Sequence, residues 1–176
     1  MDNTFTWSFL ASTAKPYIKV VACPKKELMD FLASKPVAVK PHGIFVGVID
    51  GGKAATKAGF FKQMVRTFDL PDYFGMNWDA FDDSGTEFGI LADHFVMVIT
   101  DAENFLTEKP FFQRKPRYGK PEDDLKIFCS IIEPELVWWN SEDAKKHNYA
   151  LHLILHCEPE QETKLLARLQ EAGFKL

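Results

Sequence analysis

The stretch Leu-Pro-Asp-Tyr-Phe-Gly-Met-Asn-Trp-Asp-Ala-Phe-Asp-Asp, residues 70–83, carries the strongest signal in this 176-residue sequence. It alternates acidic with aromatic side chains and contains no basic residue. Pro71 and Gly75 predict a loop, and Asn77 is a favourable N-cap for a helix that begins at Trp78. The mixture of carboxylates and aromatic rings is typical of a recognition surface, here built from a loop and the helix that follows it.

The acidic residues of this helix are expected to share one face. Asp82 and Asp83 follow Asp79 by three and four positions, and residues at these spacings are neighbours on a helix surface. An acid in the first turn is favoured by the helix dipole, but adjacent aspartates repel each other and are poor helix formers. Local stability therefore does not account for Asp82 and Asp83, whereas a cationic partner would. A merely solvated helix face is the alternative.

The stretch lies within a longer acidic window, residues 67–108, which contains ten acidic residues and no Lys or Arg. Since the formal charge of the whole chain is −4, this window at −10 leaves +6 for the remainder. Charge that is segregated along a sequence is often segregated in space, where it steers a partner of opposite sign. Residues 107–120 predict a basic surface loop. A pI near 5.7 argues against direct nucleic-acid binding.

Strands and helices alternate along the chain. Apolar or β-rich runs predict strands at residues 17–23, 43–49, 94–100 and 150–157. Amphipathic runs predict helices at residues 25–33, 54–68, 124–132 and 159–172. Pro134 is expected to break the third of these helices, and residues 136–149 are ambiguous. The alternation predicts an α/β layered fold with a small, mostly parallel sheet packed on helices.

The length of the chain fits a single domain, residues 1–176. We divide it into an N-terminal β-α extension (1–42), a core (43–157) that includes the basic loop, and a C-terminal helix (158–176). The sequence has no signal peptide and no run long enough to span a membrane, which favours a cytoplasmic protein without a membrane partner. Three widely spaced cysteines are expected to be small buried side chains in a reducing compartment: Cys23, Cys129 and Cys157.

Signatures of enzymatic chemistry are missing from the sequence. The common nucleotide-binding and hydrolase motifs do not occur, so we expect no cofactor and no catalytic residue. A metal site is not expected either, because one helix supplying three aspartates is a weak Mg²⁺ signal. His152 and His156 on one strand would lie ~13 Å apart, too far to chelate an ion together. An enzyme using Asp79 and Asp83, or His94, as acid and base ranks last, since nothing in the sequence would raise a pKa.

Residues 70–83 also resemble a known family. The residues Leu70-Pro71-Asp72-Tyr73-Phe74-Gly75-x-Asn77-x-Asp79-Ala80-x-x-Asp83 are similar to the stretch Leu-Pro-acid-Tyr-Tyr-Gly-x-Asn-x-Asp-Ala-x-x-Asp of the barstar family, intracellular inhibitors of a secreted ribonuclease. The resemblance covers residues 43–105 well and continues loosely through 124–132 and 151–155. It implies a small α/β fold with a parallel three-stranded sheet, and an inhibitor that plugs the active site of a toxin.

The resemblance also implies roles for individual residues. The acid matching Asp83 stands in for a substrate phosphate, while Asp79 and Tyr73 support the same contact and Gly75 lets the two backbones approach. A family tryptophan is replaced by Asp82, and Trp78 is expected to supply the lost aromatic area. A helix glutamate of the family falls near Ser130, where the chain has no charge. The expected partner-binding set is Tyr73, Gly75, Asn77, Trp78, Asp79, Asp82 and Asp83.

The leading functional hypothesis is a proteinaceous inhibitor of a toxin nuclease, of the antitoxin or immunity type. Its acidic loop-helix would block a basic active-site cleft, and its partner would be a basic protein, above all a nuclease toxin. The alternative is a non-catalytic interaction or regulatory module that binds a basic protein. In a variant of this alternative, the basic loop folds back over the acidic face.

Overall fold

The computed structural model describes residues 5–34, 43–84, 93–108, 123–147 and 149–176, so most of the predicted basic loop lies outside the described residues. Four parallel strands form one sheet in the order β1-β4-β3-β2. Their bounds are Ile18–Ala22 (β1), Ile44–Asp50 (β2), His94–Thr100 (β3) and Ala150–Cys157 (β4). The central strands β3 and β4 are buried on both faces, which explains their continuous apolar sequences. The predicted α/β fold with a small parallel sheet is confirmed.

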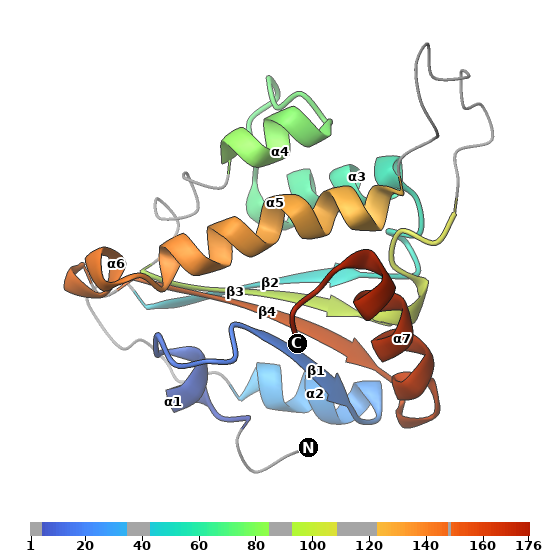
Figure 1. Ribbon diagram of the computed structural model, residues 1–176, viewed down its shortest axis with the longest axis horizontal. Helices are drawn as coiled ribbons and strands as arrows, with labels where there is room; N and C mark the ends of the chain where they lie inside the picture. Colours follow the sequence, from blue (N-terminus) through green and yellow to red (C-terminus); the bar gives the residue numbers. More distant parts are fainter. Residues whose placement is uncertain (1–4, 35–42, 85–92, 109–122, 148) are drawn as a thin grey trace.

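Helices cover both faces of this sheet (Figure 1). One face carries α1 (Trp7–Leu10) and α2 (Lys25–Ala33), and the other carries α3 (Lys57–Phe68), α4 (Trp78–Ser84) and α5 (Asp124–Trp139). The remaining elements are α6 (Glu142–Lys146), α7 (Glu162–Ala172) and two short 3-10 turns, η2 (Ala102–Asn104) and η3 (Pro159–Gln161). Two separate hydrophobic clusters result, because successive residues of β3 point to opposite faces.

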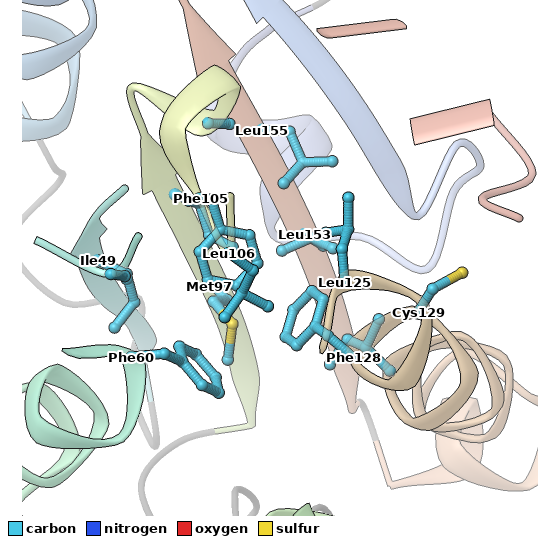
Figure 2. Close-up of a cluster of buried hydrophobic side chains, with 14 of the residues drawn as sticks. Ile49, Phe60, Met97, Phe105, Leu106, Leu125, Phe128, Cys129, Leu153 and Leu155 are labelled. Carbon is cyan, nitrogen blue, oxygen red and sulfur yellow. The ribbon is translucent and has the colours of Figure 1, made fainter. Parts of the chain in front are cut away.

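The larger cluster lies between the sheet and helices α3, α4, α5 and α7 and is rich in phenylalanine. Figure 2 shows Phe60 of α3 and Phe128 of α5 on either side of Met97 of β3. The two rings lie 5.6 Å apart, centroid to centroid, in an edge-to-face arrangement that is favourable for aromatic pairs. All three side chains are fully buried. Helices α3 and α5 are therefore fixed to the sheet and to each other, and they form the base on which α4 rests.

The N-terminal extension joins the sheet. Strand β1 pairs with β4 in parallel, so the sheet has four strands where the resemblance implied three. Two buried histidines of β4 contribute to this attachment: the Nε2 atom of His152 lies 2.7 Å from the Ser12 carbonyl oxygen, and that of His156 lies 2.9 Å from the Cys23 carbonyl oxygen. Both histidines are fully buried. The two histidines are therefore used separately, and each contacts a different part of the N-terminal extension.

Most predicted elements appear within a few residues of their expected bounds, but Pro134 does not end its helix. Helix α5 runs through it to Trp139. A proline inside a helix loses one backbone hydrogen bond and crowds the preceding turn. Beyond it, however, Leu136 and Trp139 are buried at 2% and 1% exposure. Burial of side chains of this size is worth several kcal/mol, which outweighs the local cost and keeps the helix intact.

The three cysteines are buried and unpaired, as expected.

Burial lowers the pKa of His152, which gives a testable pH dependence. The ordinary pKa of histidine is about 6.5, so an unfolded chain takes up a proton below this pH that the folded chain resists. The free energy of unfolding should therefore fall as the pH drops below about 6.5. His94, whose pKa is also lowered by burial, adds to the same trend. Urea unfolding at several pH values between 5 and 8 measures this dependence. The free energy of unfolding should change less with pH in His152→Gln than in the wild type, and an unchanged pH dependence would contradict the prediction.

Candidate functional site: an acidic loop and helix

Helix α4 begins where the sequence predicts, because Asn77 caps it. The Asn77 side-chain oxygen accepts a hydrogen bond of 2.9 Å from the backbone N–H of Ala80. The side-chain amide nitrogen donates to the carbonyl oxygen of Gly75 at 2.9 Å. One side chain therefore ends the loop and starts the helix, which is the usual role of an N-cap asparagine. Asn77 is one of the expected site residues, and its role in the structure is to fix the start of α4.

Two buried aromatic residues anchor α4. Trp78 is 8% exposed, and its ring lies 5.1 Å from that of Phe61 and 5.7 Å from that of Phe60, centroid to centroid. Its indole N–H donates to the Asp124 carboxylate of α5 at 3.0 Å. Phe81, one turn later, is 1% exposed and stacks on Phe128 of α5. The expectation that Trp78 supplies aromatic area to a partner is therefore corrected: its ring belongs to the core and fixes the helix.

Asp79, Asp82 and Asp83 of α4 are all exposed, whereas the two anchors of the helix, Trp78 and Phe81, are buried. Residues at i, i+3 and i+4 are neighbours on a helix surface, so the three carboxylates lie close together. Because Trp78 and Phe81 pack against α3 and α5, the helix that carries the carboxylates is held rigidly. The predicted acidic face is thus brought together by the fold.

The loop before the helix presents a second kind of group. Tyr73 is 87% exposed, and Met76, whose φ of 45° is left-handed, is 47% exposed. Both side chains lie in the chain segment that leads into the acidic face. A tyrosine with this exposure offers a flat apolar ring and a hydroxyl to a partner. The structure therefore leaves the Tyr73 side chain accessible in the loop that precedes the acidic face.

Gly75 approaches its own helix closely. A Cβ atom at this position would lie 2.8 Å from the Asn77 side-chain nitrogen and 3.2 Å from the Ala80 Cβ. The resemblance implied that this glycine makes room for a partner's backbone. The geometry shows an internal reason for it, since a larger side chain would push against the cap of α4.

Replacing Gly75 with alanine should therefore disturb the N-cap and lower the free energy of unfolding by about 1 kcal/mol, the usual value of a lost cap. Gly52→Ala is the matched control, because the only neighbour among the described residues that its Cβ would meet within 4 Å is the Asp50 carboxylate oxygen, at 3.3 Å. Urea denaturation of both variants measures the difference. Equal stabilities would show that the close contact at Gly75 has no energetic consequence.

Glu135 is a carboxylate next to this face that the sequence did not reveal. It projects from α5, its pKa is raised by burial and then by the charge of Asp82, and it is half-buried. One of its oxygens has no hydrogen-bond partner among the described residues. Sequence patterns did not indicate Glu135 because Pro134 was expected to end the helix before it. The resemblance placed the family glutamate near Ser130 instead, which is exposed and more than one turn away.

Residues 44–114 match the family model described as Barstar (barnase inhibitor). This segment is similar to the barstar family. It contains β2, α3, the acidic loop, α4 and β3. No curated protein matches the chain. Members of the barstar family are inhibitors rather than enzymes, and the family is named for a nuclease that it inhibits, which supports an inhibitor-type role with a protein partner.

The barstar segment does not gather all of the acidic window on one surface. Asp101 follows β3 and forms an ion pair with Lys25 of α2, and Glu103 is 9% exposed within η2. Both lie at the carboxyl ends of the strands, among residues that fix the N-terminal extension. The expectation that segregation along the sequence becomes segregation in space therefore holds for the acids on α4 but not for Asp101 and Glu103.

The described residues outside the acidic face provide few groups for other chemistry. Among them, no group of three or more His, Cys, Asp or Glu side chains could hold a metal ion. None of their helices is both long and apolar enough to cross a membrane. His94, considered above as an acid or base, begins β3 and is half-buried. Among the described residues, the three aspartates of α4 therefore remain the leading candidate for a functional site.

Proposed function

We propose that this protein inhibits a nuclease toxin, as an antitoxin or immunity protein, by inserting the acidic face of α4 into a basic active-site cleft. One observation carries the proposal: Asp79, Asp82 and Asp83 are exposed on one short helix, which the buried rings of Trp78 and Phe81 fix to the core. The helix lies within the segment that matches the barstar family.

The physical basis is imitation of a phosphate backbone. A nuclease binds phosphates with cationic side chains, and those same side chains would pair with carboxylates held at suitable positions. A rigid helix adds to the affinity, because fewer degrees of freedom are lost on binding. The negative charge of the face also accelerates association with a cationic partner, and salt screens this effect. Neither a cofactor nor turnover is needed.

The proposed partner-binding residues divide into two groups. Asp79, Asp82, Asp83 and Tyr73 are exposed and would contact the nuclease directly. Gly75, Asn77 and Trp78 would act by holding the loop and helix in place. We place the protein in the cytoplasm, where three unpaired buried cysteines suit a reducing environment.

We also propose that residues 1–176 form one domain. The N-terminal extension supplies the edge strand β1, and the C-terminal helix α7 contributes Leu165 and Leu169 to the larger cluster. Removing either would expose buried surface. A single cooperative unfolding transition, the same by tryptophan fluorescence and by circular dichroism, is the expected behaviour of such a unit.

The function is tested with a nuclease captured from the native lysate on the immobilised protein. Addition of the wild-type chain should suppress hydrolysis of an RNA or DNA substrate by this nuclease, and the double variant Asp79→Ala/Asp83→Ala should not. Glu160→Ala/Glu171→Ala is the matched control, since it removes the same charge from exposed positions on the C-terminal elements. Capture without suppression would favour the interaction module over the inhibitor. Equal suppression by both double variants would contradict the proposed site.

A further inference from the structure

The sheet has two edge strands, β1 and β2, and the edge of β2 is covered by its own helix. The backbone N–H of Asp50 donates to the Gln63 side-chain oxygen at 3.0 Å, and the Gln63 amide donates to the Asp50 carbonyl oxygen at 2.7 Å. The Thr67 hydroxyl, also on α3, donates to the Val48 carbonyl oxygen at 3.4 Å. Side chains of α3 therefore occupy backbone groups that another strand would otherwise pair with.

The hydrogen bonds of β1 show which of its residues face away from the sheet. Just before β1, the Tyr17 carbonyl oxygen accepts from the Leu153 N–H of β4 at 2.8 Å. Just after it, the Cys23 N–H donates to the Cys157 carbonyl oxygen at 3.2 Å. Alternate residues of a parallel strand bond to the same neighbour, so the odd-numbered residues face β4. The residues whose backbone groups point away from β4 are Ile18, Val20 and Ala22.

The outer edge of β1 is open. Within the described part of the chain, the outward N–H and C=O groups of residues 18, 20 and 22 have no hydrogen-bond partner. Val20 and Ala22 are partly exposed. A lysine on an edge strand usually discourages pairing, but the Lys19 ammonium lies over the Phe9 ring, 5.7 Å from its centroid, on the α1 side of the sheet. The backbone of this edge can therefore receive another strand.

A groove adjoins this open edge on the side of the sheet that carries α5. It has a volume of about 770 Å³ and lies between the start of β1, the carboxyl-terminal half of α5 and the end of the chain. Ile18 lines it, and Trp138 in its wall is 53% exposed. Two further exposed apolar side chains in the wall are Val137 and Leu176. A strand added beside β1 would direct every second side chain toward this hollow.

The charges around the groove balance one another. Lys15 and Lys175 are offset by the Glu133 carboxylate and by the terminal carboxylate of Leu176. The Lys175 ammonium lies 3.8 Å from the Glu133 carboxylate, which also accepts a hydrogen bond of 2.7 Å from the Lys175 backbone N–H. Neither sign of charge is in excess, so the groove suits an uncharged, apolar side chain.

We propose that the β1 edge and this groove together bind an extended, uncharged segment of a protein partner, which joins the sheet beside β1. Backbone hydrogen bonds to residues 18, 20 and 22 would hold the segment, and its apolar side chains would pack against Val137 and Trp138. A compact small molecule fits less well, because it cannot pair with a row of donors and acceptors along a strand. The site lies outside residues 44–114 and is a feature that this chain adds to its barstar segment.

The neutral peptide acetyl-Thr-Val-Thr-Leu-Thr-Val-Thr-amide is the probe for the test. NMR of the full chain should show the amide resonances of Ile18, Val20 and Ala22 shifting with the peptide and exchanging more slowly with solvent. The amides of Lys19 and Val21, which already face β4, should keep their exchange rates. The same peptide N-methylated at every residue keeps the side chains but loses the donors, and it should not bind.

Three results would overturn the proposal. The first is an absence of change at the outward amides. The second is equal binding of the N-methylated peptide, which would show that the backbone of β1 takes no part. The third is a dimer of the free chain in which these amides are already protected from exchange, because a second copy would then cover the edge.

Two variants locate the site. Val20→Pro removes one outward N–H without removing a bond to β4, and Trp138→Ala removes apolar surface from the groove. Each should weaken peptide binding about tenfold, a change of about 1.4 kcal/mol. Lys164→Ala is the control, since Lys164 is exposed on α7 and does not line the groove.

Asp79→Ala/Asp83→Ala should bind the peptide like the wild type, because α4 belongs to neither the edge nor the groove. This variant separates the strand site from the acidic face. Normal binding in Trp138→Ala or in a folded Val20→Pro, or loss of binding in either control, would contradict the assignment. If Val20→Pro does not fold, as judged by circular dichroism, Trp138→Ala alone decides.

Discussion

Asp83→Ala should weaken the complex with the cognate nuclease by about 3 kcal/mol, or about a hundredfold in Kd, the range observed when one partner of a buried charge pair is removed. Asp83 lies on the exposed acidic face of α4. In the complex it would be desolvated against cationic groups of the nuclease, which would lose their counter-charge in the variant. The stability of the isolated protein should barely change, since an exposed substitution of this kind shifts the free energy of unfolding by less than about 0.5 kcal/mol.

Surface plasmon resonance at two salt concentrations measures this effect. Glu171→Ala serves as the control because it removes one exposed charge from α7, far along the chain from α4. We expect the control to bind like the wild type, and the wild-type association rate to fall with salt. An Asp83→Ala complex as tight as that of the wild type would show that the acidic face is not the contact surface.

Trp78→Ala should lower the free energy of unfolding by about 3–5 kcal/mol, the range for removing a large aromatic side chain from a core. The ring contacts Phe60 and Phe61, and its N–H satisfies the Asp124 carboxylate. The substitution would leave a cavity under α4 and remove a hydrogen bond between α4 and α5. Binding to the nuclease should weaken as well, although the ring itself is 8% exposed.

Trp138→Ala is the natural control, because it removes the same side chain from a position that is 53% exposed on α5. Its cost in urea denaturation should be below about 1 kcal/mol. Trp78→Phe separates the two contributions of Trp78, since it keeps most of the ring and loses the N–H donor. Equal costs for Trp78→Ala and Trp138→Ala would contradict the anchoring role.

The sequence was sufficient for the parts of the fold that rest on local patterns. The apolar runs of β3 and β4, the cap at Asn77 and the spacing of the aspartates on α4 each have a local physical cause, and the structure confirms these elements. The similarity to the barstar family, which the family model finds over residues 44–114, could be predicted from residues 70–83 because the motif is contiguous. Hydrophobic periodicity and helix caps can be identified from neighbouring residues alone, without the elements that pack against them.

Features that depend on tertiary packing were missed. Nothing local distinguishes Trp78 from an exposed interface tryptophan; it is buried because α3 and α5 meet behind it. Glu135 reaches the acidic face because α5 continues through Pro134, which burial of Leu136 and Trp139 decides. Trp138 is exposed and Trp139 is buried for the same reason, since tertiary packing covers only one of the two side chains. In each case, burial or exposure is decided by side chains that are distant in sequence, and intrinsic helix propensity carries no information about them.

The central claim is that the acidic face of α4 occupies the phosphate-binding cleft of a nuclease. Competition with a non-hydrolysable oligonucleotide tests it most directly. If the claim holds, the oligonucleotide and this protein exclude each other, so the apparent Kd of the protein for the nuclease rises in proportion to the oligonucleotide concentration. Formation of a ternary complex, with an apparent Kd that does not depend on the oligonucleotide, would contradict it.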